Sequence, residues 1–488
     1  MDNKVTAESN NEKIGLIVLI AIVVSSMIGS GVDSLPQNMA ESSAVGPVII
    51  AWLICGFGMY FIARVFIVLS DVRPDLQAGI YMYAQEGFGS LVAFLVAWGY
   101  WLMTIFSNVA FSVMVMDTLN YFLPGDFKGG NNVASIIGAS ILIWGFHVLV
   151  LSGTRVAGRL NLIGTVAKLV PLVVFVATVV YFLNYSAITH DVWGHELTEG
   201  NKPLGSVFSQ VLAPLFVALW AFIGIESAVA LSGRARNSKD VSRATLIGFV
   251  ISLTICLLIS VLPFGVLSQN ALSQIENPST AGVMKALTGN WGEWFINLGV
   301  LISILSSWLA WTMICAEIPM VAAQNGTFPA TFAKKNDKGA ASTALWVSSG
   351  MMQVVVLLVY FANNAWLALL AISAIMVLPA YLASAAYLLK ICMTGEFARR
   401  TSNGRTLAIV SGVIGVGFCL FMVYASEIKY VAMTPLIITL GIPLHICAKK
   451  QNKTNTRLFS PLEYFSLCVL IALDVLVVTL YFRGSIIL

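Results

Sequence analysis

Charged residues are scarce in this 488-residue chain: Asp, Glu, Lys and Arg together make up 10% of it, where soluble globular proteins average about 25%. Hydrophobic residues make up 58%. A soluble domain of this composition would expose large apolar surfaces to water, so that class is excluded. Long polar tracts and sustained heptads are also missing, which excludes a disordered chain and a coiled coil. The composition indicates a polytopic membrane protein, whose apolar side chains are solvated by lipid.

Residues that ligate metals are few. The four histidines have no ligand spacing, and the seven cysteines form no CxxC pair, so we expect no metal site and no cofactor. The loop at about 185–205 holds two histidines and several acids; we interpret it as a solvated loop rather than a metal site. Clustered His, Asp and Glu or a nucleophile motif are also lacking, which argues against an enzyme.

Apolar runs long enough to cross a bilayer, about 20 residues each, recur along the whole chain. After a polar tail at 1–13 they predict an all-α protein with about thirteen spans, the first of them an uncleaved span rather than a signal peptide. We place the spans at 14–38, 47–70, 90–122, 133–151, 160–184, 206–232, 243–268, 291–323, 343–362, 364–390, 405–425, 430–448 and 462–482.

The distribution of Lys and Arg between alternate loops predicts the orientation. If the tail at 1–13 is cytoplasmic, loops on its side carry about 21 Lys and Arg, and loops on the other side carry about five. Cytoplasmic loops of membrane proteins have this excess. An error in one early span would exchange the sides of all later loops and largely remove the imbalance. We therefore expect the N-terminus inside and the C-terminus outside.

Two spans are interrupted by small and polar residues. The first contains 25–31 (SSMIGSG), and the sixth contains 220–227 (WAFIGIES). Small residues can simply allow close helix packing. Breaks at corresponding positions of two halves, however, indicate a transporter with inverted repeats and a site near the middle of the membrane. We expect a core at 14–448, with repeats at about 14–184 and 206–390 and two further helices, and an additional helix at 462–482.

An ordered series of motifs resembles one known family. The series resembles the amino acid–polyamine–organocation superfamily, within it the basic amino acid/polyamine antiporters, and most of all bacterial arginine/ornithine antiporters. It extends through spans one to twelve. The motifs are 27–31 (MIGSG), 35–38 (LPQN), 78–81 (AGIY), 97–101 (AWGYW), 161–162 (NL), 222–226 (FIGIE), Trp311 and 315–317 (CAE).

The resemblance implies a LeuT-type fold of 5+5 inverted repeats with about 12–13 transmembrane helices. It also implies that the protein lies in the inner membrane of a bacterium and can form a homodimer. It also implies a substrate site. Ser30 and Gly31 would hold the substrate carboxylate, and the carbonyls of Met27, Trp220 and Ile223 would hold the α-ammonium.

Three further side chains are assigned through the same resemblance. Trp220 would stack on the substrate chain, with a cation–π contribution for a cationic end. Trp311 would act as a middle gate, and Asn108 would contact the distal end of the substrate. The alternative for both tryptophans is ordinary packing, since the chain contains 12 of them.

Ionisable residues inside spans are costly and mark functional sites. Glu226 follows the break of the sixth span, and in the resembled family this glutamate couples proton or gate state to transport. Lys168 occupies the region where sodium-coupled relatives bind sodium, so we expect a fixed ammonium in place of the ion and transport that is independent of sodium. The alternative for Lys168 is that it snorkels to the interface.

Asp33 departs from the resembled family, which usually has a bulky apolar residue there. A carboxylate beside the site could pair with a cationic substrate and favour an amine that lacks its own carboxylate. It could equally cap the second half of the first span, as Asp does at helix starts. The departure makes an amino acid/amine pair, such as histidine/histamine or lysine/cadaverine, a competitor of the arginine/ornithine pair.

The function expected from the sequence is antiport. We expect exchange of a basic amino acid for its metabolic product by alternating access, with arginine/ornithine as the leading pair and an electrogenic amino acid/decarboxylated amine exchange as the alternative. A transporter-like amino acid sensor is a remote alternative, since it would need a long signalling tail. The expected partners are the small-molecule substrates and membrane lipid, and not nucleic acid.

Overall fold

The computed structural model describes residues 15–76, 80–195, 203–227, 236–397, 404–451 and 459–483. Over these ranges the chain is helical and contains no strand, as expected for an all-α protein. The predicted tail at 1–13 lies outside the described residues.

The first half of the chain forms these elements: α2 (Leu16–Met27), η1 (Ser30–Ser34), α3 (Leu35–Ala40), α4 (Val45–Val72), α5 (Tyr81–Phe88), α6 (Ser90–Phe122), η2 (Lys128–Gly130), α7 (Val133–Leu151), α8 (Thr154–Tyr181), α9 (Tyr185–His190), α10 (Val207–Leu212) and α11 (Leu215–Ala221). The second half forms α13 (Ser238–Val261), η4 (Leu262–Gly265), α14 (Gln269–Ser273), α15 (Ser279–Thr288), α16 (Asn290–Gln324), η5 (Ala330–Ala333), α17 (Ser342–Val359), α18 (Ala365–Met393), α20 (Arg405–Ala425), α21 (Ile428–Thr439), α22 (Ile442–Gln451) and α23 (Pro461–Phe482).

Ten helices in the described ranges are long and apolar enough to cross a membrane, and the bent pair Leu16–Met27 and Gly31–Ala40 makes eleven. The remaining two predicted spans, 160–184 and 206–232, correspond to α8 and to α10 with α11. Their apolar stretches, Ala167–Tyr181 and Val207–Ala221, are shorter. The protein is therefore a polytopic all-α membrane protein. Residues 228–232 of the predicted sixth span lie outside the described ranges.

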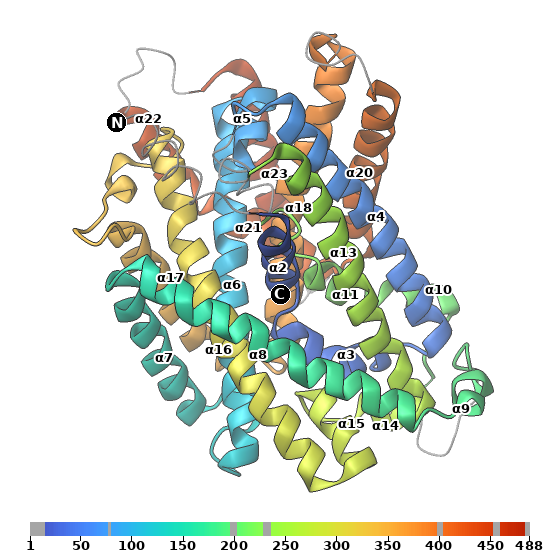
Figure 1. The fold of residues 1–488 in the computed structure, drawn as a ribbon. Coiled ribbons are helices and arrows are strands. Elements are labelled where there is room, and N and C mark those ends of the chain that lie inside the picture. The colour runs from blue at the N-terminus through green and yellow to red at the C-terminus, as the bar shows by residue number, and fades with distance from the viewer. Residues whose placement is uncertain are drawn as a thin grey trace, which may run out of the picture.

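The core of the bundle is built around α6, which packs against both α16 and α18. Figure 1 shows α5 at one end of this bundle and α14 and α15 at the opposite end, and we call these the α5 end and the α15 end. Lys128 forms an ion pair with Glu276 at 3.2 Å, which brings two loops predicted to face outside together at the α15 end. Under the predicted orientation the α5 end faces the cytoplasm.

An ion cluster joins three helices at the α5 end. Arg73, which ends α4, lies 2.7 Å from Asp75, 3.7 Å from Glu86 of α5 and 3.4 Å from Glu396 beyond α18. Its guanidinium also donates to the hydroxyl of Tyr387 on α18. The hydrogen bond with Asp75 holds the pKa of Arg73 above its usual value. Arg73 is buried, whereas its acidic partners are partly exposed. Because Arg73 contacts Glu86 on α5 and Tyr387 on α18, the cluster fastens α4 to both helices.

The last helix, α23, lies at the periphery and packs mainly on α21. Its first turn is a capping box between Ser460 and Glu463. Glu463 also accepts hydrogen bonds from the hydroxyl of Ser90 at 2.8 Å and the backbone N–H of Leu91 at 3.0 Å, in the first turn of α6. One carboxylate therefore caps two helices, and it pairs with Lys449 at 3.1 Å.

Candidate functional site

The first span is broken where the sequence predicts it. Helix α2 ends at Met27, and Ile28 and Gly29 take extended backbone conformations before the short turn η1 begins. The two halves are bent by 47°. The second half, α3, starts with a proline in its first turn, where the missing N–H costs no hydrogen bond.

The sixth span is broken as well. Helix α11 ends at Ala221, and a series of turns follows to Glu226. Gly224 has a φ of +106°, a region that side chains rarely adopt and that favours glycine. The carbonyl of Trp220 accepts from the N–H of Ile223 at 3.1 Å, so the helix tightens as it ends.

The two breaks touch each other at two points. An ideal Cβ on Gly31 would lie 1.8 Å from Cζ3 of Trp220, so the indole rests directly on the backbone of the first break. An ideal Cβ on Gly224 would lie 2.9 Å from the carbonyl oxygen of Ser26. Each contact requires a glycine on one side, which explains these two glycines physically. The two interrupted helices therefore meet in the interior of the bundle.

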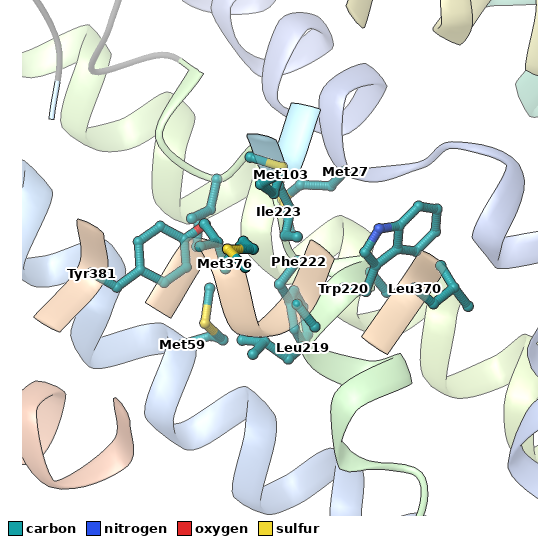
Figure 2. Packing of buried hydrophobic residues seen from close by; sticks show 14 of the residues in the cluster. Met27, Met59, Met103, Leu219, Trp220, Phe222, Ile223, Leu370, Met376 and Tyr381 are labelled. Atoms are coloured by element: carbon teal, nitrogen blue, oxygen red, sulfur yellow. The ribbon is translucent and has the colours of Figure 1, made fainter. Parts of the chain in front are cut away.

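Four of the predicted site residues lie at this meeting point. Met27, Trp220 and Ile223 belong to one cluster of buried side chains, together with Tyr381 (Figure 2), and Gly31 lies under the indole. Ser30 begins η1 next to Gly31, and its side chain lies outside the described part of the structure.

Aromatic side chains surround Trp220. Its ring centroid lies 5.8 Å from that of Trp366 on α18 and 6.2 Å from that of Phe111 on α6, both in edge-to-face contact. Phe111 also lies close to Gly29. A cationic or aliphatic group that reached this place would meet aromatic faces with little water, where cation–π attraction is strongest.

Asn108 and Trp311 line the interface between α6 and α16. Both are buried. The amide of Asn108 donates to the carbonyl of Thr104 at 2.7 Å and accepts from the hydroxyl of Thr312 at 3.3 Å. Asn108 is therefore held by its own helix and by the residue next to Trp311. Its predicted contact with substrate stays a prediction.

Glu226 is clasped by two tyrosines that sequence reasoning did not select. Its carboxylate accepts from the hydroxyl of Tyr100 on α6, from that of Tyr381 on α18 at 3.0 Å, and from the N–H of Gly224 at 3.2 Å. Tyr100 lies within the motif at 97–101, so the motif offered a signal for it. Tyr381 has no local signal, because it lies far along the chain from Glu226. The clasp ties the sixth-span break to two core helices.

Lys168 points at the first break rather than at the membrane interface. It is only 2% exposed, and its ammonium donates to the carbonyl of Ser25 at 2.6 Å. That carbonyl belongs to the last turn of α2, where helix C-termini attract cations. A fixed ammonium therefore neutralises the end of the first half-helix, and the snorkelling alternative does not describe this position.

Asp33 contacts the first two residues of α15. Its carboxylate accepts from the hydroxyl of Thr280 at 3.2 Å, and its carbonyl accepts from Ser279 at 3.2 Å. No side-chain cap is present at Ser34, where α3 begins, so the capping alternative does not describe the contact that Asp33 makes. The N–H of Gln37 also donates to Ser279, at 3.1 Å. The outer half of the first span is thus fastened to α15.

The sequence model of a known protein family, described as amino acid permease, matches residues 14–442 of this chain. The chain belongs to the amino acid permease family. The resemblance to the amino acid–polyamine–organocation superfamily is thereby confirmed. A permease moves its substrate without changing it covalently, so this protein is a transporter and not an enzyme. Among the described residues no group of three or more His, Cys, Asp or Glu side chains could hold a metal ion.

Relatives of this permease share almost its whole length. An arginine/agmatine antiporter of Chlamydia pneumoniae is 47% identical over 477 residues, 98% of each chain. Arginine/agmatine antiporters of Chlamydia caviae and Chlamydia trachomatis serovar L2 are 48% and 44% identical over 97% of each chain. The alignment with the first relative covers 98% of this chain, which leaves about 2% of its residues unmatched. The unmatched part is shorter than α23, which has 22 residues, so the relative shares at least part of the last helix.

Proposed function

We propose that this permease exchanges arginine for agmatine, the amine that remains when arginine loses its carboxyl group as CO₂. The names of relatives that are 44–48% identical over nearly the whole chain carry this proposal. The pair belongs to the alternative that the sequence left open, an amino acid for its decarboxylated amine, and replaces ornithine as the leading counter-substrate. We place the protein in the cytoplasmic membrane of a bacterium, with its N-terminus inside.

The two substrates share most of their recognisable groups. Both have a guanidinium, an aliphatic chain and an ammonium, and only arginine has a carboxylate. The indole of Trp220 and the carbonyls around Met27 and Ile223 would serve both substrates, through cation–π attraction and hydrogen bonds to the ammonium. The backbone N–H groups at Ser30 and Gly31 would serve arginine alone. The affinity of the site for both arginine and agmatine therefore depends chiefly on the indole face of Trp220 and on the backbone carbonyls.

Alternating access needs one closure on each side of the site. On the α5 side we assign this role to the clasp of Glu226 with Tyr100 and Tyr381, because it joins the sixth-span break to α6 and α18. On the α15 side we assign it to the hydrogen bonds that join Asp33 and α3 to α15. Breaking one set while the other is kept would open the site to one side at a time.

Charge movement follows from the substrates themselves. At neutral pH arginine has one net positive charge and agmatine has two, since the guanidinium and the ammonium stay protonated and the carboxylate is absent. Uptake of one arginine for each agmatine released would export one positive charge. A membrane potential that is negative on the agmatine side should therefore slow the release of agmatine and the exchange.

Lys168 supports exchange without sodium. Its ammonium already binds the Ser25 carbonyl at the end of α2, the position in which we expect it to replace a sodium ion. The energy would then come from the arginine and agmatine gradients and from the membrane potential.

Counterflow in proteoliposomes tests the proposal. Vesicles are loaded with agmatine, ornithine, histamine, cadaverine or no amine, and uptake of labelled arginine is followed with and without sodium. We expect uptake driven by agmatine and unchanged by sodium. Uptake driven by ornithine alone would establish the arginine/ornithine pair instead. Absence of counterflow with every amine would reject antiport and favour the sensor alternative.

A further inference from the structure

A polar cavity of about 280 Å³ opens at the α15 end, separate from the contact between the two breaks. Its walls come from the end of α6, the loop around η2, the segment between α14 and α15 and the start of α18. Its volume is close to that of small ligand pockets, about 300 Å³ and above. We call it the α15-end cavity and define it by Asp117, Lys128, Glu276, Asn277 and Trp366 among its lining residues.

The α15-end cavity lies next to the central site. Trp366 lines the cavity and is also in edge-to-face contact with Trp220, with ring centroids 5.8 Å apart. Gln37 of α3, the outer half of the first span, lines it too. A molecule that travels from the α15 end to Trp220 would therefore meet this cavity first.

The charges in the α15-end cavity suit a cation. Asp117 and Glu276 contribute two carboxylates and Lys128 one ammonium. One oxygen of Asp117 accepts from the N–H of Gly129 at 2.8 Å. The pair of Lys128 with Glu276, at 3.2 Å, is 73% exposed on both sides, and exposed pairs contribute little stability. A guanidinium, which can bind a carboxylate through two parallel hydrogen bonds, can displace Lys128 from Glu276.

Two buried polar atoms of the same cavity lining have no partner among the described residues. The indole N–H of Trp366 has no acceptor although the side chain is only 5% exposed. The side-chain oxygen of Asn277 has no donor. Buried polar groups are hydrogen-bonded as a rule, and an unmade bond is costly. A ligand with both a cationic donor group and a carboxylate would supply the missing donor and acceptor.

We propose that the α15-end cavity is a second substrate site, which binds arginine or agmatine by its guanidinium before the molecule reaches Trp220. The proposal rests on the proposed function, because that function supplies the guanidinium substrate. Glu276 and Asp117 attract the cationic end, and the indole N–H of Trp366 binds the carboxylate that only arginine has. Under the predicted orientation this site collects substrate from outside.

The test compares Glu276→Gln, and the same variant combined with Asp117→Asn, with a matched control. The control is Glu293→Gln, which makes the same charge change at the same end but in a residue that pairs with Lys285 at 3.0 Å and does not line the cavity. Because Glu276 is largely exposed, its variant should fold normally. Arginine uptake in exchange for agmatine is measured in intact cells, where substrate enters from outside, and in inverted membrane vesicles.

We expect the cavity variants to raise the KM for external arginine and agmatine roughly tenfold, as the loss of electrostatic focusing does, without lowering the maximum rate. The KM in inverted vesicles and the KM of the control should stay unchanged. The KM of the unaltered protein should also rise more steeply with salt than that of the double variant. An unchanged KM in intact cells, or an equal rise on both sides, would overturn the second site.

A second variant tests the carboxylate contact. Trp366→Phe keeps an aromatic ring against Trp220 and removes the N–H, so it should raise the KM for arginine more than the KM for agmatine. Equal changes for both substrates would overturn this contact. If the unaltered protein fails to exchange arginine for agmatine, the proposed function fails; if it exchanges them and the cavity variants behave like the control, only the second site fails.

Discussion

Replacing Gly31 by alanine should damage substrate binding through one methyl group. An ideal Cβ at this position would lie 1.8 Å from Cζ3 and 2.5 Å from Cε3 of Trp220. Carbon atoms pack at about 3.5 Å, so the indole or the backbone of the break must move by about 1.7 Å, the difference between 3.5 and 1.8 Å. Overpacking of this kind costs about 1–3 kcal/mol.

If the indole stacks on the substrate, this cost opposes binding. The KM for arginine and for agmatine should then rise about 5- to 150-fold, the factors that correspond to 1–3 kcal/mol. The assay is uptake of labelled arginine into agmatine-loaded proteoliposomes, with folding checked by size-exclusion chromatography. Gly29→Ala is the matched control in the same break. Its added Cβ would lie 3.8 Å from Phe111, an ordinary contact, so its KM should stay close to that of the unaltered protein.

A double variant separates steric displacement from other effects. Trp220→Leu removes the ring atoms that a Cβ on Gly31 would meet and, since it also removes the cation–π contact, should itself raise both KM values. Once leucine is present, Gly31→Ala should add little, because residues in contact are not additive. A normal KM for Gly31→Ala, or fully additive penalties in the double variant, would refute the inference that the indole rests on Gly31.

Three further variants test the contacts around the site and at the α5 end. Thr280→Val leaves the buried carboxylate of Asp33 without its hydroxyl donor. The variant should lower the midpoint of thermal unfolding, since hydrogen bonds to charged groups contribute about 1.5–3 kcal/mol. Thr280→Ser keeps the hydroxyl and should have a normal midpoint, whereas a normal midpoint for the valine variant would contradict the contact. Tyr381→Phe removes one donor to Glu226 and should lower the maximum exchange rate more than it changes KM, because the hydroxyl binds the glutamate of the proposed closure; a change confined to KM would assign the hydroxyl to substrate binding. Arg73→Met leaves three acids facing one another and should lower the thermal midpoint by several degrees, and an unchanged midpoint in detergent would show that the cluster is not stabilising.

The sequence predicts the features of this fold that local composition determines. Apolar runs and the imbalance of Lys and Arg predict the spans, because lipid imposes both. Both breaks are also predictable, since glycines and serines interrupt otherwise apolar helices. The contact between Gly31 and Trp220 is harder to predict from the sequence. Each residue belongs to a recognisable motif, but only the fold shows that the indole lies on the glycine.

The parts that sequence reasoning missed depend on distant partners. Tyr381 lies 155 positions from Glu226, and Thr280 lies 247 positions from Asp33. Nothing near either residue marks it as a partner. For Asp33 the local rule favours capping of α3, but the packing of α15 against the first span offers a hydroxyl in the interior. A buried carboxylate needs such a donor more than the helix needs a cap.

Glu463 has a practical consequence for shortened versions of this protein. The matching family model ends at residue 442, which makes α23 an attractive segment to delete for crystallisation. The carboxylate of Glu463, however, accepts hydrogen bonds from the N–H of Leu91 and the hydroxyl of Ser90. Deletion would leave the start of α6 uncapped, on the same helix that positions Tyr100 and Asn108. A purification tag placed after residue 483 keeps this anchor, whereas truncation at the end of the family match removes it.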